Sequence, residues 1–311
     1  MKHIKRYLSP TLMVIAAMIW GFAFSAQKAA ENIAPFTLGA TRSLFAFIFL
    51  IFVILFSDSF LDTGRRLFSK EKKIDINRTE IIGGTICGII LAFASFLQQA
   101  GINGGTDAGK ASFITALYVV MVPIYALALK KRAPLNVWIS MPIAVVGFYF
   151  LCITGDFTMA LSDLLVLLCA IIFPFHILAI DSFSPKCDGV RMSCVQFFIA
   201  TLVNFVFALI FESPINFVEI GVSIFPVLFL GIGSSGIAYT LQIMGQRGVN
   251  PAAASILLSL ESVFGVLGSV IFLGEKMTGR EYIGCAVVFL AVIISQIDIS
   301  TLPFIENKKT E

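Results

Sequence analysis

Ten apolar stretches, each about 20 residues long, follow one another along this chain with short polar breaks between them. An α-helix of about 20 residues rises about 30 Å, which is the thickness of the hydrocarbon core of a bilayer. We therefore expect an all-α integral membrane protein with ten transmembrane helices. They fall near residues 8–26, 35–56, 79–101, 107–129, 134–153, 161–181, 191–211, 221–245, 250–273 and 279–297.

The composition agrees with this class of protein. Of the 311 residues, 58% are hydrophobic and 13% are charged, whereas a soluble domain carries about 25% charged residues. The stretch at 8–26 follows three basic residues, as a signal peptide would, but it is longer than the usual apolar core of one, so we expect it to remain as the first helix. The six cysteines include no Cys-x-x-Cys pair, and we interpret them as packing residues.

The positive charges predict how the chain crosses the bilayer. With a cytoplasmic N-terminus, seventeen of the 22 Lys and Arg residues lie on the inner side, including a cluster at 65–78, and Arg42 lies within a span. The outer side holds Lys28, Lys110, Lys276 and Arg280. Because cytoplasmic loops are enriched in Lys and Arg, we predict a multi-pass protein of the cell (cytoplasmic) membrane with both termini in the cytoplasm.

The second half of the chain echoes the first at an offset of about 144 residues. A Leu-Gln pair at 97–98, a turn and an apolar helix to Leu129 are matched by a Leu-Gln pair at 241–242, a turn and an apolar helix to Leu273. We expect two five-helix repeats, over 1–153 and 154–311. Because five is odd, the second repeat must enter the bilayer from the opposite side. The result is a 5+5 inverted repeat, typical of transporters that bind their substrate near the midplane.

Four segments resemble the two repeats of EamA-type transporters of the drug/metabolite transporter superfamily. They read WGFAF at 20–24, LQQAG at 97–101, LESVF at 260–264 and GEKMT at 274–278, and the likeness extends over nearly the whole chain. The resemblance implies ten helices in a 5+5 inverted repeat and the efflux or uptake of a small metabolite, without naming one. Ser262 stands where a proline is common in the family, which bears only on a local kink.

Three ionisable side chains inside the spans are candidates for substrate binding or coupling. An ionised carboxylate at bilayer depth costs at least about 2.5–3.5 kcal/mol. Glu261 should therefore face a water-filled cavity or a partner. It could exchange a proton during a transport cycle or make a structural hydrogen bond between helices. Arg42 could hold a carboxylate or phosphate of the substrate, or pair with backbone carbonyls or an acid of another helix. His176 follows the helix-breaking Pro174 and could bind substrate or relay protons, with a packed, hydrogen-bonded histidine as the alternative.

Polar and aromatic side chains recur near the expected interface of the repeats. As a cluster they could line a pocket for an amphiphilic solute with little net charge, whereas each one alone could equally bond or pack between helices. The set comprises Trp20, Gln27, Gln98, Gln99, Tyr118, Tyr239 and Gln242.

Residues 104–111 come close to a phosphate-binding loop. Ala111 replaces the Ser or Thr that would bind Mg²⁺, and no soluble strand precedes the loop. We therefore expect no nucleotide, other cofactor or metal here, but a tight outer turn with Lys110 near an outer entrance.

The sequence favours a secondary active transporter that moves a small metabolite, an amino acid or a related organic solute, by alternating access. We expect export, driven by the solute's own gradient or by protons taken up at Glu261. The expected partners are a small-molecule substrate and membrane lipids, without nucleic acid, and the chain should act as a monomer or homodimer.

The alternative is a membrane-embedded transferase for a lipid-like substrate. Such enzymes normally show clustered Asp or His residues at a membrane surface, whereas Asp58, Asp62, Asp156 and Asp163 are scattered here, so we do not expect an enzyme.

Overall fold

The computed structural model describes residues 2–65, 77–152, 159–273 and 277–297, and within them the chain forms helices joined by turns. The first half contains α1 (Lys2–Ala29), α2 (Pro35–Arg65), α3 (Arg78–Asn103), α4 (Ala108–Ala116), α5 (Tyr118–Ala128) and α6 (Leu135–Cys152). The second half contains α7 (Leu161–Phe183), η1 (Ser184–Lys186), α8 (Gly189–Phe211), α9 (Phe217–Val222), α10 (Ile224–Leu228), η2 (Phe229–Ala238), α11 (Tyr239–Gly245), α12 (Pro251–Leu258), α13 (Glu261–Leu273) and α14 (Gly279–Gln296).

The predicted all-α membrane class is confirmed. In the described ranges, nine helical segments are long and apolar enough to cross a membrane, and Leu135–Leu151 is a shorter apolar helix at the place of the fifth predicted span. Two helices extend beyond their predicted bounds. Helix α1 begins at Lys2, and α2 continues to Arg65, beyond its predicted end near residue 56. Part of the basic cluster at 65–78 lies in residues 66–76, outside the described residues.

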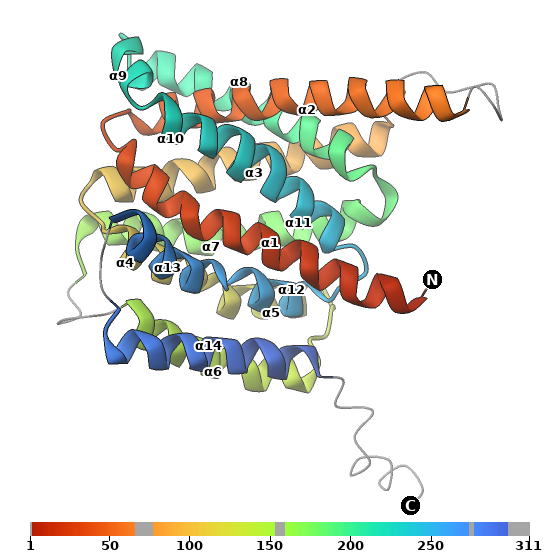
Figure 1. Cartoon of the computed structure of the whole chain (residues 1–311), viewed down its shortest axis with the longest axis vertical. Coiled ribbons are helices and arrows are strands. Elements are labelled where there is room, and N and C mark those ends of the chain that lie inside the picture. Colours follow the sequence, from red (N-terminus) through yellow and green to blue (C-terminus); the bar gives the residue numbers. More distant parts are fainter. Residues whose placement is uncertain (1, 66–76, 153–158, 274–276, 298–311) are drawn as a thin grey trace, which may run out of the picture.

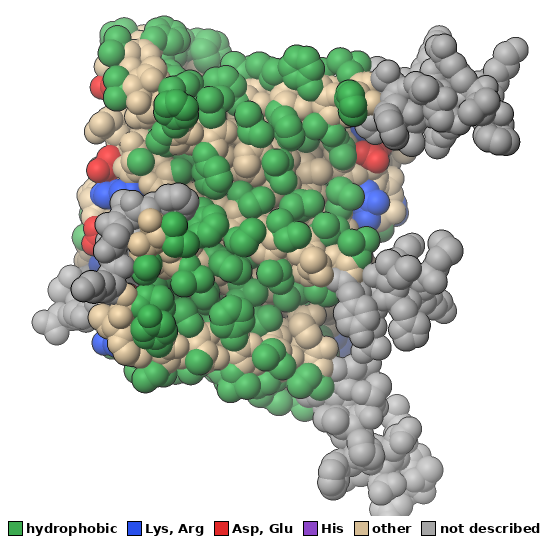
Figure 2. Space-filling view, viewed as in Figure 1, with side chains coloured by type: hydrophobic (Ala, Val, Ile, Leu, Met, Phe, Trp, Pro, Cys, Tyr) green, Lys and Arg blue, Asp and Glu red, His purple; other side chains and the backbone are tan. Residues whose placement is uncertain are grey.

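The outer surface suits contact with lipid. Figure 1 shows the helices side by side with their axes running in broadly the same direction. In Figure 2, hydrophobic side chains cover the middle of the visible face, and the charged side chains gather at the two margins where helices end. Large apolar side chains such as Phe52, Leu209 and Phe289 are exposed. An apolar band bounded by charges is what a bilayer requires of a protein surface.

Helices from the two halves share one hydrophobic core. The most extensive contacts pair α6 with α14, α3 with both α7 and α8, α2 with α8 and α1 with α13, and each pair joins a helix of the first half to one of the second. The span that contains α12 and the start of α13 is the most enclosed: 89% of it is buried, compared with 28% of the α14 span. The stretch around Glu261 is therefore central, and α14 is peripheral.

A glycine allows α1 to approach α13 closely. A Cβ atom added to Gly21 would lie 2.4 Å from Phe264 Cβ and 2.7 Å from the carbonyl oxygen of Glu261. Real Cβ atoms essentially never come so near another heavy atom, so only glycine fits without displacement. This contact holds the backbone of Glu261 directly against the first helix.

Two of the predicted spans are interrupted near their middle. The expected helix at 107–129 bends at Leu117 (φ −61°, ψ −12°), and the expected helix at 250–273 bends at Ser259 (φ −65°, ψ −8°). At both bends the backbone changes to i→i+3 hydrogen bonds: Leu117 N donates to Ile114 O, and Ser262 N donates to Ser259 O. Each segment remains long and apolar enough to cross a membrane once, and the turn of tighter hydrogen bonding interrupts its regular helix without a proline or glycine at the turn.

A local sequence signal accounts for the start of the second interrupted helix. Asn250 caps α12, since its side chain accepts a hydrogen bond from Ala252 N, and Pro251 occupies the first turn. An asparagine cap followed by proline is a common helix start, because the proline lacks only an N–H that would have no partner inside the helix.

The predicted span at 221–245 departs from a regular α-helix. Its central part, η2, is a π-helix that carries Gly231, Gly233, Ser234, Ser235 and Gly236. Gly231 approaches α2 closely, because a Cβ there would lie 2.7 Å from Phe45 Cβ. Segments of π-helix are uncommon and often occur at functional sites.

Candidate functional site

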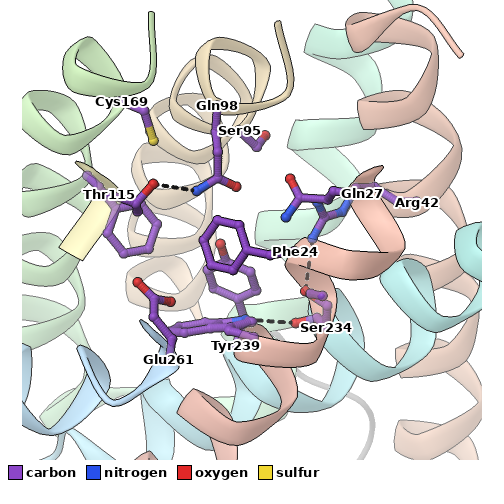
Figure 3. A pocket seen from close by; sticks show the side chains of 13 residues that line it. Phe24, Gln27, Arg42, Ser95, Gln98, Thr115, Cys169, Ser234, Tyr239 and Glu261 are labelled. Atoms are coloured by element: carbon purple, nitrogen blue, oxygen red, sulfur yellow. Dashed lines mark hydrogen bonds between the residues drawn. The ribbon is translucent and has the colours of Figure 1, made fainter. Parts of the chain in front are cut away.

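A cavity lies between the two halves, beside the turn before α13. Its volume is about 30 Å³, which is room for about two water molecules, so in this conformation it is too small for an organic solute. Figure 3 shows the polar side chains that point into it. The lining residues are Trp20, Ala23, Phe24, Gln27, Arg42, Ser95, Gln98, Thr115, Cys169, Phe173, Ser234, Tyr239 and Glu261.

Arg42, from α2, is held by two hydroxyl groups of η2. Its Nε donates to Ser235 Oγ at 3.0 Å and its Nη2 donates to Ser234 Oγ at 3.0 Å. The side chain is buried, and no acid of the described residues lies within ion-pair distance of it. The sequence analysis expected backbone carbonyls or an acid as the protein partners of Arg42. The structure shows two serine hydroxyl groups instead. Hydroxyl groups orient the guanidinium without neutralising its charge.

Glu261 is the first residue of α13 and immediately follows the turn. Its side chain is buried, and within the described part of the chain its Oε1 atom has no hydrogen-bond partner. Tyr118, the first residue of α5, approaches the carboxyl from the other interrupted helix.

Aromatic rings form one wall of the cavity. Trp20 packs against Tyr239, with ring centroids 4.6 Å apart, and meets Phe173 edge-on at 6.3 Å. The indole Nε1 donates to the carbonyl oxygen of Ser234 at 3.2 Å. Trp20 is therefore fixed by contacts to the second half while it belongs to the first.

Two amide side chains complete the polar lining. Gln98 donates to Thr115 Oγ1 at 3.0 Å. Gln27 lies beside Arg42 in Figure 3, and its Oε1 is buried without a partner among the described residues. Such an unsatisfied acceptor suits a site that a water or a solute occupies.

Four of the predicted residues lie behind the cavity wall and do not line it. His176 Nε2 lies 3.0 Å from Gln196 Oε1, and its ring packs edge-on against Tyr239 at 5.5 Å. Gln99 donates to the carbonyl oxygen of Gln27 and to Asn103 Oδ1. Tyr118 and Gln242 are fully buried and are not part of the lining. For His176 this geometry matches the alternative of a packed, hydrogen-bonded histidine.

Sequence reasoning missed several lining residues. It assigned no site role to Ser234, which lines the cavity, or to the adjacent Ser235, although their hydroxyl groups orient Arg42. Phe24, Thr115 and Phe173 carried no signal that separates them from other residues of apolar spans. The adjacent serines in a glycine-rich run were the one available clue.

The turn that resembles a phosphate loop binds α4 to α7 instead. Lys110 Nζ lies 2.5 Å from Asp163 Oδ2, and Thr106 Oγ1 donates to Asp163 Oδ1 at 2.9 Å. The backbone N–H of Ala160 donates to the same carboxylate. Lys110 is therefore part of a structural contact at this end of the protein.

Comparison with known proteins gives consistent results. A sequence model of the EamA-like transporter family matches this chain twice, over residues 8–153 and 160–296. An uncharacterized transporter of Archaeoglobus fulgidus is 29% identical over 302 residues, which cover 94% of this chain and 86% of the relative. An uncharacterized transporter of Methanothermobacter thermautotrophicus is 22% identical over 310 residues, with coverage of 94% and 87%. A solved crystal structure shares the fold, with a TM-score of 0.71 at 17% identity over 92% of this chain and 95% of the other.

Proposed function

This chain belongs to the EamA-like transporter family, and on that premise we propose that it is a secondary active transporter that carries a small organic solute, an amino acid or a related metabolite, across the cytoplasmic membrane. The observation that carries the proposal is the cavity. Side chains from both halves line it, and it lies beside the turn of an interrupted helix. Interrupted helices between two repeats are where transporters commonly bind substrate.

Transport by alternating access requires the cavity to open to each side in turn. The present cavity of about 30 Å³ admits no organic solute, so the structure supports a closed state from which opening must begin. The turns at Leu117 and at Ser259–Leu260 and the π-helix η2 are the positions where the spans depart from regular α-helix. We propose that the two inverted halves rock about the cavity and that these positions absorb the change.

We further propose export as the direction of net transport and Glu261 as the site of coupling to protons. A buried carboxyl with a free oxygen can alternate between a protonated and an ionised form as the cavity opens to one side or the other. Glu261→Gln keeps the shape of the side chain and cannot exchange a proton. It should therefore abolish the response of transport to a pH gradient.

The test is exchange of radiolabelled solutes in proteoliposomes. Pools of amino acids and related metabolites are loaded inside or outside the vesicles, with and without an imposed pH gradient, and protein-free vesicles serve as the control. Saturable exchange of one pool is the expected result. If a folded protein moves none of the pools, the transporter proposal fails. If exchange is saturable but indifferent to the gradient, only the proton coupling fails.

A further inference from the structure

One basic and one acidic side chain line the cavity, and they do not form an ion pair with each other. Arg42 belongs to α2 and Glu261 to α13, and Figure 3 shows them on opposite sides of the space. Neither forms an ion pair with any described residue. The other lining side chains described above carry amide, hydroxyl, thiol, phenol, indole or hydrocarbon groups.

An unpaired charge inside a membrane protein is costly. Taking an ion out of water without a partner costs several kcal/mol, and hydroxyl groups compensate only part of that. The cavity combines a guanidinium held on two serines with a carboxyl that has a free oxygen. A solute that supplies one negative and one positive group would compensate both residues at once.

We propose that this cavity, once it has opened as the transport cycle requires, recognises a zwitterion with an uncharged side chain, that is, a neutral amino acid, whose carboxylate binds Arg42 and whose ammonium group binds Glu261. This inference rests on the proposed transport function and specifies its substrate class. It also assigns Glu261 a second role as a ligand of the solute.

Arg42 has the capacity to hold a carboxylate. A guanidinium carries five N–H donors, and the two serine hydroxyls use one on Nε and one on Nη2. Three N–H groups remain, and the planar guanidinium is suited to two parallel hydrogen bonds with a carboxylate. The serines fix the orientation of the guanidinium. Binding of the solute therefore costs little further conformational entropy of the Arg42 side chain.

The opposite side suits an ammonium group. Glu261 Oε1 can accept a hydrogen bond that no described residue provides. Trp20 and Tyr239 form an aromatic wall of the same cavity, and the faces of such rings attract cations.

The remaining walls select an uncharged side chain. Ala23, Phe24, Cys169 and Phe173 are the apolar members of the lining. A solute with a third charged group would bury it against these side chains without a partner. Acidic and basic amino acids should therefore bind poorly.

The decisive experiment compares each neutral amino acid with two analogues that lack one charged group. For leucine these are 3-methylbutylamine, which lacks the carboxylate, and 4-methylpentanoate, which lacks the ammonium group; methionine and phenylalanine have equivalent pairs. Binding is measured as the rise in the unfolding temperature of the purified wild-type protein, and exchange is measured in proteoliposomes. At least one neutral amino acid should bind at least tenfold more tightly than both of its analogues, and glutamate and lysine should compete poorly.

Two variants assign the two contacts. Glu261→Gln should reduce the preference for the amino acid over 4-methylpentanoate to about onefold, and Arg42→Gln should do the same for the preference over 3-methylbutylamine. Gly109→Ala is the matched control, because a Cβ there meets no atom within 4 Å, and it should keep both preferences. If a variant fails to fold, the comparison of amino acids with their analogues on the wild-type protein still tests the proposal.

Three outcomes would overturn the inference: an amine or an acid that binds as tightly as its parent amino acid, a charged amino acid that binds more tightly than the neutral ones, or no response to any neutral amino acid. If an analogue is exchanged and the amino acid is not, the transport function stands and zwitterion recognition falls. If the folded protein exchanges no solute at all, both proposals fall together.

Discussion

The interrupted helices α4–α5 and α12–α13 bend with nearly the same backbone angles, at Leu117 and Ser259, yet they carry different chemistry. The two bends are 142 positions apart, close to the offset at which the sequence repeats. In the first half Tyr118 and Val119 follow the bend, whereas in the second half Leu260 and Glu261 follow it. The repeat thus duplicates the backbone, while the ionisable group occurs in one copy only.

A second difference lies in the helices that precede these bends. Helix α3 is α-helical from Arg78 to Asn103 and begins with a capping box formed by Asn77 and Glu80. The corresponding span of the second half contains the π-helix η2, whose serines bind Arg42. Departures from regular helix in the second half therefore coincide with the polar groups of the cavity.

The largest effect is expected from removing the charge that distinguishes the two bends. Glu261→Gln should lower the initial rate of neutral amino acid exchange by about 100-fold, because breaking one partner of a buried charge contact typically costs about 2–5 kcal/mol. Tyr118→Phe removes only a hydroxyl from the other interrupted helix and should cost no more than about tenfold. Rates are compared in proteoliposomes at equal protein content. Equal losses in both variants would mean that the carboxyl has no special role.

A smaller effect is expected at the π-helix. Ser235→Ala removes one of the two hydroxyl partners of Arg42 and should raise the half-saturating concentration of the solute about tenfold, since a hydrogen bond to a charged group contributes about 1.5–3 kcal/mol. Ser140→Ala in α6 is the control, because that hydroxyl bonds the backbone of its own helix. A concentration dependence identical to wild type in Ser235→Ala would remove η2 from the site.

The contact of α1 with α13 can be tested through stability. Gly21→Ala should lower the free energy of unfolding by about 1 kcal/mol net, because overpacking costs about 1–3 kcal/mol and alanine regains about 1 kcal/mol of helix propensity. Gly109→Ala in α4 gains the propensity without a clash and should be neutral or stabilising. Unfolding in detergent by a denaturant series measures both. A stable Gly21→Ala variant would show that α13 can shift away from α1 at little cost.

The smallest effect is expected at the ion pair that joins α4 to α7. Lys110→Met should cost at most about 1 kcal/mol of stability, as is usual for partly exposed pairs; the side chain of Lys110 is 23% exposed. Asp163→Asn should cost more, because that buried carboxylate also accepts hydrogen bonds from Thr106 and Ala160. The same denaturant series measures both, and the reverse order would contradict this assignment.

The spans were predictable because each satisfies a single requirement, a length and composition that can cross a bilayer. The Asn250 cap was predictable because its signal is local. The bends at Leu117 and Ser259 were not, since neither position carries a proline or glycine that would signal a break in the helix. The partners of Arg42 were also hidden, because Ser234 and Ser235 lie more than 190 positions away and pairing over such distances depends on the tertiary fold.

The helices are interleaved in a way that bears on biosynthesis. Helix α7 is tied to the first half near both of its ends, by Asp163 to Lys110 and by Asp181 to Lys131, and α1 packs on α13, which is made near the end of translation. The first five spans therefore enter the bilayer before their packing partners exist. A gene divided between residues 153 and 160 should yield two fragments that accumulate only when produced together in the same cell.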